Sequence, residues 1–293
     1  MDVAPDMKSD LLSGAEIAQY RRDGYVVLRG LLGPRSIEAC KAALTGLAVG
    51  SIASRETSLM YEKGVDVARL SPEEREFAIR KYMDFCMDAP ALRDAAFSRR
   101  LHLVLDQLLG QGRVLFQEMA LVKPPRIGSE KPWHQDASYF RIKDPGLVVG
   151  VWISLDEASR SNGCMELVPG SHLGGGVPHV HENDFNLCRI VPGKVDLAAR
   201  RAIEMGPGDA LVFHGLIHHY TAANTSNMRR RAVQYHYHQI GTVWGSVDDH
   251  LAHFHDEDGN YAGCTVPHGD DAGSNYAYRN GLPREIAPVD TSV

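Results

Sequence analysis

Between residues 114 and 238 the chain repeats one pattern, in which a short apolar run is followed by glycine, proline, asparagine or aspartate. Runs of this kind occur at 114–122, 147–155, 164–169 and 210–214, and residues 231–238 alternate between polar and apolar side chains. Apolar runs of this length between turn residues predict β-strands. Many short strands in succession favour two packed sheets or a barrel. The sequence therefore predicts a mainly β core.

The residues before this core predict flanking helices. Ser13, with Glu16 three positions on, predicts a capped helix that continues to about Arg22. We expect further elements as follows: a strand at 24–29, a helix from 34, a loop at 50–70, a helix from 71, and a helical region at 89–109. These helices are expected to pack on the outer face of one sheet.

Composition excludes some functions. The chain has 293 residues and a formal net charge of −6, with no basic excess that would attract nucleic acid. It lacks an apolar stretch long enough to span a membrane. Its first residues do not follow the order of a secretory signal, and its last three are not a peroxisomal signal. We therefore expect a cytoplasmic protein, and the sequence indicates no oligomeric state.

The cysteines do not indicate a disulfide framework. There are five, at positions 40, 86, 164, 188 and 264, and no two have the Cys-x-x-Cys spacing. An odd number without paired spacing argues against disulfides and against a structural zinc site. Reduced thiols are the expectation.

The segment Trp133-His134-Gln135-Asp136 carries the strongest chemical signal. On a strand, residues two apart point to the same face, so His134 and Asp136 could reach one metal ion. A pair of this kind also fits a simple histidine–carboxylate hydrogen bond. A third ligand would decide between these readings, because two histidines and one carboxylate suit non-haem Fe(II) in oxygenases.

A second polar cluster could supply that third ligand. His214, His218 and His219 precede the arginines at 229–231, and periodicity chooses neither among the histidines nor among the arginines. Alternation only excludes Arg230 from sharing a face with its neighbours. An arginine here could clamp the carboxylate of a dicarboxylate co-substrate. His236 and His238 share a face but have no carboxylate nearby in sequence, which favours a structural or substrate-facing role.

Taken in order, these motifs resemble the phytanoyl-CoA dioxygenase family, whose members use Fe(II) and 2-oxoglutarate on a double-stranded β-helix, or jelly roll. The resemblance is carried by 20–27, 133–136, 151–156, 161–172 and 206–215, with His219, Asn224 and Arg230. It spans about 13–240. We therefore expect a single oxygenase domain over 1–293, with a helical part at 13–110, a jelly-roll core at 114–240 and an extension at 241–293.

The resemblance also implies the site residues. His134, Asp136 and His219 would bind iron, and Arg230 would bind the distal carboxylate of 2-oxoglutarate, with Thr221 as a further donor. The remaining residues implied near the co-substrate are Trp152, Met119, Gln135 and, by a more local match, Lys81. An ordinary solvated helix position is the alternative for Lys81.

The implied reaction is the hydroxylation of an aliphatic C–H group, coupled to oxidative decarboxylation of 2-oxoglutarate by O2. Halogenating relatives have a small residue at the carboxylate position, so Asp136 favours hydroxylation. The alternatives are a cupin-type metal enzyme that does not use 2-oxoglutarate, and a non-catalytic scaffold. The substrate would be a small molecule or an acyl-CoA. Arg141 and Lys143 could receive its carboxylate or phosphate, and the alternative for this exposed basic pair is that it is simply solvated.

Overall fold

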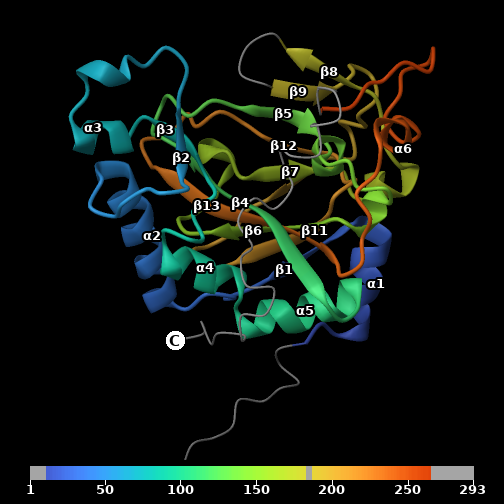
Figure 1. Cartoon of the computed structure of the whole chain (residues 1–293), viewed down its shortest axis with the longest axis horizontal. Helices are drawn as coiled ribbons and strands as arrows, with labels where there is room; N and C mark the ends of the chain where they lie inside the picture. Colours follow the sequence, from blue (N-terminus) through green and yellow to red (C-terminus); the bar gives the residue numbers. More distant parts are fainter. Residues whose placement is uncertain (1–10, 183–186, 265–293) are drawn as a thin grey trace, which may run out of the picture.

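A computed structural model describes residues 11–182 and 187–264. Its centre is two antiparallel sheets that face each other (Figure 1). The larger sheet contains, in spatial order, β1 (Tyr25–Leu28), β11 (Ala210–His214), β6 (Val149–Ser154), β13 (Arg230–Gln239), β4 (Arg113–Lys123), β3 (Ile79–Met83) and β2 (Ser58–Tyr61). The smaller contains β10 (Arg201–Ile203), β7 (Met165–Leu167), β12 (His219–Thr221) and β5 (Lys131–His134). A separate hairpin joins β8 (His179–Glu182) to β9 (Leu187–Ile190).

Six α-helices occur in the described residues, and the first five precede β4 in the chain, with β1, β2 and β3 between them. They are α1 (Gly14–Asp23), α2 (Pro34–Val49), α3 (Pro72–Glu76), α4 (Pro90–Ala96), α5 (Arg99–Leu109) and α6 (Val247–Leu251). Single 3₁₀ turns lie at η1 (Val67–Arg69), η2 (Asp136–Tyr139), η3 (Pro145–Leu147), η4 (Arg160–Asn162) and η5 (Ser171–Gly174). None of the helices in residues 11–182 and 187–264 combines the length and apolar composition needed to cross a membrane.

Local chemistry explains where α1 begins and ends. The Ser13 hydroxyl accepts a hydrogen bond from the Glu16 amide, while the Glu16 carboxylate accepts one from the Ser13 amide. This reciprocal pair satisfies two amides that no helical carbonyl can reach. Gly24 then ends the helix at φ 81°, a left-handed conformation that glycine adopts without strain. The predicted helix is confirmed.

Helices cover one face of the larger sheet, as predicted. Side chains from α2, α4 and α5 form a continuous apolar cluster with outward-facing residues of the sheet, including Ile153, Val233 and Tyr235. Figure 1 shows these helices on one side of the larger sheet and the smaller sheet on the other. A second apolar cluster, which contains Trp152 and Phe213, fills part of the space between the sheets. The mainly β, jelly-roll expectation is confirmed.

Three details of the predicted elements are wrong. Residues 50–70 are not only a loop, because they contain β2 and η1. The helical region at 89–109 is two helices, since Ser98 caps a new helix by accepting a hydrogen bond from the Leu101 amide. The segment around Lys81 is β3 rather than a helix, so the helix alternative for that lysine is also wrong.

The prediction of reduced thiols is wrong for one pair. Cys188 in β9 and Cys264 form a disulfide across 76 residues of sequence. Cys40, Cys86 and Cys164 are free and buried. The spacing rule failed because the pair is distant in sequence, and only the fold brings β9 beside the C-terminal segment. The Cys264 amide also donates to the Ser138 carbonyl, which holds this segment beside η2. Residues 265–293 of the predicted extension lie outside the described residues, and the single-domain assignment stays a prediction.

Candidate active site

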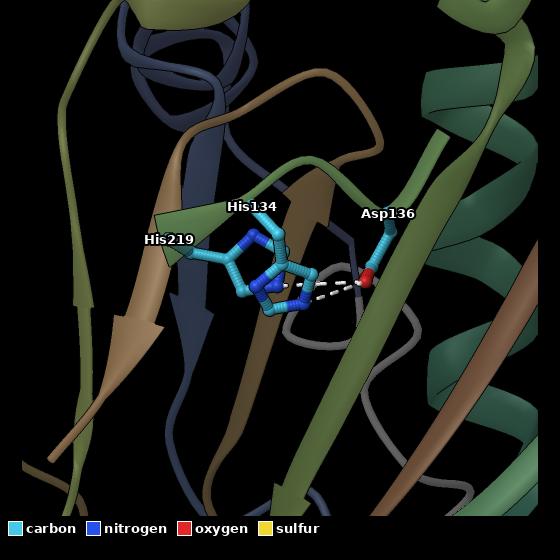
Figure 2. A group of neighbouring side chains, drawn as sticks. All are labelled: His134, Asp136 and His219. Carbon is cyan, nitrogen blue, oxygen red and sulfur yellow. Dashed lines mark ion pairs between the residues drawn. The ribbon is translucent and has the colours of Figure 1, made fainter. Parts of the chain in front are cut away.

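The two candidate histidines face each other across neighbouring strands of the smaller sheet. β5 ends at His134 and β12 begins at His219, and these two residues are partners in the strand register. Their ring centroids lie 4.1 Å apart. The structure therefore selects His219 from the three histidines that the sequence left open, and places it beside His134 (Figure 2).

Asp136 joins them by a route that differs from the predicted one. We expected His134 and Asp136 on one strand face, but the strand ends at His134 and Asp136 begins the 3₁₀ turn η2. Asp136 Oδ1 lies 3.3 Å from His134 Nε2 and 3.5 Å from His219 Nε2. All three residues are at most 5% exposed, and one ligand atom from each lies within 4.8 Å of the others.

Backbone carbonyls orient the two rings for metal binding. His134 Nδ1 lies 2.7 Å from the Pro132 carbonyl, and His219 Nδ1 lies 3.1 Å from the Ile217 carbonyl. An imidazole that donates from Nδ1 to a carbonyl keeps a lone pair on Nε2. Burial, with the charges of His219 and Lys131, holds the pKa of His134 well below its ordinary value. The ring is therefore neutral, the form that binds metal.

The other oxygen of Asp136 is held by β13. Asp136 Oδ2 lies 2.8 Å from His236 Nε2 and 3.0 Å from Gln234 Nε2. Burial favours a raised pKa for Asp136, but His219 and His236 outweigh it and hold the pKa well below its ordinary value. The carboxylate is thus ionised and oriented. Sequence reasoning missed this role of His236, because its carboxylate partner lies 100 residues away in the chain.

A cavity of about 330 Å³ opens beside these three side chains. It is lined by both sheets, and its polar and apolar groups are mixed. Besides the three ligand candidates, four residues implied near the co-substrate line it, Lys81, Met119, Thr221 and Arg230, and so does His236. Arg141 and Lys143 do not line it, and the Lys143 ammonium instead pairs with Asp249 at 3.6 Å.

Arg230 is the buried cation of this cavity. It is 1% exposed, and its guanidinium carbon lies 5.2 Å from the centroid of the Trp152 ring. One terminal nitrogen donates to the Leu121 carbonyl at 3.3 Å, whereas Nε has no hydrogen-bond partner among the described residues. Burial lowers the pKa of Arg230 to about 10, which leaves it charged at neutral pH. A buried guanidinium without a carboxylate partner fits an anionic ligand.

Two of the residues that the resemblance implies near the co-substrate do not line the cavity. Gln135 turns away, since its amide nitrogen donates to the Gly175 and Leu216 carbonyls and its oxygen accepts from the Val177 amide. These contacts link the residues after η5 and the segment before β12 to the end of β5. Trp152 is fully buried, and its ring supports Arg230. Both side chains could act on the site only through the residues that they support.

The two remaining histidines of the second cluster lie outside the cavity. His214 Nδ1 accepts a hydrogen bond from the Leu216 amide, and its ring packs near Tyr20 and His172. His218 is buried, and neither ring nitrogen has a partner in the part of the chain that the structure describes. His214 therefore packs against its neighbours and is not one of the candidate ligands.

Comparison with known proteins decides the family. The family model described as phytanoyl-CoA dioxygenase matches residues 20–232. The chain belongs to the phytanoyl-CoA dioxygenase family. Together with the His134–Asp136–His219 group, this membership identifies an iron- and 2-oxoglutarate-dependent dioxygenase, as the sequence predicted. It excludes the scaffold alternative and the cupin-type alternative.

Individual relatives are distant. A probable phytanoyl-CoA dioxygenase of Caenorhabditis elegans is 25% identical over 240 residues, which cover 78% of this chain and 76% of the relative. A phytanoyl-CoA dioxygenase domain-containing protein 1 of Danio rerio is 27% identical over 276 residues, covering 80% and 93%. Family members at such identities can differ in substrate.

Solved structures agree in fold. EctD from S. alaskensis with bound Fe superposes with a TM-score of 0.64 at 20% identity, over 84% of this chain and 82% of EctD. The non-heme alpha-ketoglutarate-dependent carbocyclase SnoK from nogalamycin biosynthesis gives 0.61 at 22% identity, over 82% and 90%. These likenesses support the jelly-roll architecture.

Proposed function

We propose that this dioxygenase hydroxylates an aliphatic C–H group of a small molecule. In this proposal His134, Asp136 and His219 bind Fe(II), and Arg230 and Thr221 bind the distal carboxylate of 2-oxoglutarate. One observation carries the proposal. The three candidate ligands and the buried, unpaired guanidinium face the same cavity. A two-histidine, one-carboxylate set leaves metal positions open for a co-substrate.

The protein side chains prepare the site before any ligand binds. The Pro132 and Ile217 carbonyls fix the rings of His134 and His219, and β13 fixes the Asp136 carboxylate. Such supporting contacts hold ligands in the geometry that the metal requires. Fe(II) held there would activate O2, with 2-oxoglutarate as the two-electron reductant, and so allow oxidation of an unactivated C–H group.

The apolar lining supports an aliphatic target. Met60, Met83, Met119, Leu121 and Phe140 line the cavity beside the candidate ligands. Apolar walls bind a hydrocarbon segment and exclude water from it. Asp136 occupies the carboxylate position, which supports hydroxylation over halogenation.

Cavity size supports a small substrate. A volume of about 330 Å³ is near the lower end of ~300–1,000 Å³ for small-molecule sites, and 2-oxoglutarate must share it. The nucleotide part of an acyl-CoA would have to lie outside. A cytoplasmic location stays a prediction.

Succinate release tests this function. Enzyme with Fe(II), O2 and 2-oxoglutarate would be assayed with free carboxylic acids, phosphate esters, amides and acyl-CoAs. We expect one class to give succinate and a product heavier by one oxygen atom in equal amounts. Product formation without consumption of 2-oxoglutarate would overturn the proposal.

Arg230→Met provides the matched variant of the co-substrate site. It should raise the KM for 2-oxoglutarate by roughly 10–100-fold, because a hydrogen bond to a charged group contributes ~1.5–3 kcal/mol. The Lys143→Met enzyme should keep the wild-type KM, since Lys143 lies outside the cavity.

A further inference from the structure

A β-bulge turns one lysine of the smaller sheet toward the cavity. His134 pairs with His219, but Thr221 pairs with Lys131, so three steps along β5 match two steps along β12. In a regular strand, residues three apart point to opposite faces. Here the extra residue brings Lys131 into the cavity lining with His134, whereas the intervening Trp133 stacks on Tyr220 instead. Bulges beside active sites commonly redirect a side chain in this way.

Among the described residues, the Lys131 ammonium uses only part of its capacity to donate hydrogen bonds. It donates to the Tyr139 hydroxyl at 2.7 Å and lies 4.9 Å from the centroid of that ring. An ammonium has three N–H donors, and no carboxylate of the described residues forms an ion pair with it. Both oxygens of Asp136 are engaged by histidines and Gln234. Glu130 accepts from the Tyr220 hydroxyl instead.

Two further cations stand close to Lys131. Arg80 and Lys81 of β3 also line the cavity, and neither forms an ion pair with a described residue. Burial, then the charges of Lys131 and Arg80, lowers the pKa of Lys81 to about 8. Burial, then Arg80, lowers the pKa of Lys131 to about 8. Like charges gathered in a half-buried site destabilise one another unless an anion binds.

Charge balance shows that the cofactors do not neutralise the cavity. Five cationic side chains line it, against the carboxylates of Asp136 and Glu130. Fe(II) brings two positive charges and 2-oxoglutarate two negative ones. Binding of both therefore leaves the excess of three positive charges in the cavity unchanged. Lys123 is buried and donates to the Ser129 and Thr221 carbonyls, and burial holds its pKa well below the ordinary value. Counting Lys123 as neutral still leaves a positive excess.

We propose that Lys131, with Arg80 beside it, forms a subsite for an oxyanion of the primary substrate, while Lys81 keeps the place near the co-substrate that the resemblance implies. The substrate would then be an aliphatic carboxylate or phosphate ester whose hydrocarbon part lies along Met60, Met83 and Met119. This inference rests on the proposed function. In the proposed function Arg230 binds the co-substrate, and it lies on β13. Arg80 lies on β3, and β4 separates these two strands in the sheet.

Calorimetry on the full chain, loaded with Fe(II) and saturating 2-oxoglutarate without O2, tests the subsite. The probes are butanoate, butyl phosphate and the neutral isostere butanamide. Saturating 2-oxoglutarate keeps the probes from Arg230. We expect one of the two anions to bind at least about tenfold more tightly than butanamide, because a hydrogen bond to a charged group contributes ~1.5–3 kcal/mol. The anion that binds more tightly shows whether the oxyanion of the substrate is a carboxylate or a phosphate.

Lys131→Met should remove that preference and leave the dissociation constant of 2-oxoglutarate within about twofold of wild type. Tyr139→Phe should weaken the preference by a smaller factor, and Lys143→Met, outside the cavity, should retain it. Equal binding of the anions and the amide to wild type overturns the subsite, as does a preference that survives Lys131→Met. Weaker 2-oxoglutarate binding with unchanged probe binding in Lys131→Met reassigns Lys131 to the co-substrate. If wild type fails to bind 2-oxoglutarate itself, the proposed function has failed instead.

Discussion

The two faces of the larger sheet are built from the same strands but have opposite chemistry. On β13, Val233, Tyr235 and Tyr237 point to the helices and belong to the apolar cluster there. The alternate residues Gln234 and His236 point to the cavity. On the helix side, the Tyr235 and Tyr237 hydroxyls donate to the Leu92 and Ala96 carbonyls of α4.

The cavity side also contains buried polar atoms without partners among the described residues, and the Tyr82 hydroxyl is likewise unpaired on the helix side. Arg230 Nε and His236 Nδ1 are both buried and unpaired. Buried polar groups without partners are costly, so the inner face gives up stability in order to bind ligands. The outer face supplies the stability that this requires. Substitutions on the two faces should therefore affect different measurements.

The largest expected effect is on the inner face. Asp136→Ala removes the only carboxylate of the candidate iron site and should lower the rate of 2-oxoglutarate turnover by about a thousandfold or more, since a bound metal contributes several kcal/mol. Anaerobic titration should show no tight Fe(II) binding, while the denaturation midpoint stays near wild type. Glu130→Ala, at the other cavity carboxylate, should keep its iron affinity. Wild-type turnover by the Asp136→Ala enzyme would refute the iron site.

The outer face should give the opposite pattern. Ile153 is fully buried between α-helices and sheet, and Ile153→Ala should lower the free energy of unfolding by ~2–5 kcal/mol. Iron affinity should stay unchanged in urea-free buffer. Met119→Ala should lower the free energy of unfolding by less, because the Met119 side chain already borders the cavity. If Ile153→Ala weakens iron binding as strongly as it weakens folding, the two faces are not independent.

The division between the faces was predictable only in part. Alternation along 231–238 and the ordered motifs predicted the strands, the sheet and the ligand candidates. The turn at Asp136, the bulge that redirects Lys131 and the Cys188–Cys264 disulfide were not predictable. Each depends on register or on contacts between distant segments, which no local pattern encodes. Arg141 and Lys143, the basic pair for which the sequence left a substrate-binding and a solvated role open, do not line the cavity.

A smaller effect should come from the residue that orients Asp136. His236→Phe keeps the aromatic packing with Phe116 and Phe140 but loses the contact to Asp136 Oδ2. Its Fe(II) dissociation constant should rise by roughly 10-fold, at the lower end of supporting-residue effects, because Gln234 still donates. His236→Gln, which retains a donor, should recover part of the affinity. His238→Phe, on the same strand face and stacked on Phe116, should bind iron normally. Equal loss in both phenylalanine variants would indicate packing rather than orientation.

The last expected effect concerns a carboxyl on the apolar face and appears only when the pH is changed. Glu118 lies opposite Tyr235 in the strand register and accepts from the Cys86 amide. Burial raises the pKa of Glu118 to about 7, above its ordinary value of 4.5. Between these two pH values the folded chain therefore binds more protons than the unfolded chain, so Glu118 makes stability fall as pH rises from about 4.5 to about 7.

Glu118→Gln should remove that part of the pH dependence. Relative to wild type, the variant should gain about 1–3 kcal/mol in unfolding free energy between pH 5 and pH 8, because one unit of pKa corresponds to ~1.4 kcal/mol. Urea midpoints of both proteins at the two pH values give this difference. Glu157→Gln provides a comparison carboxyl outside the helix-covered cluster. A stability difference between Glu118→Gln and wild type that is the same at pH 5 and pH 8 would mean that Glu118 is ionised in the folded chain throughout. The helix-covered face would then tolerate a buried charge that its apolar neighbours argue against.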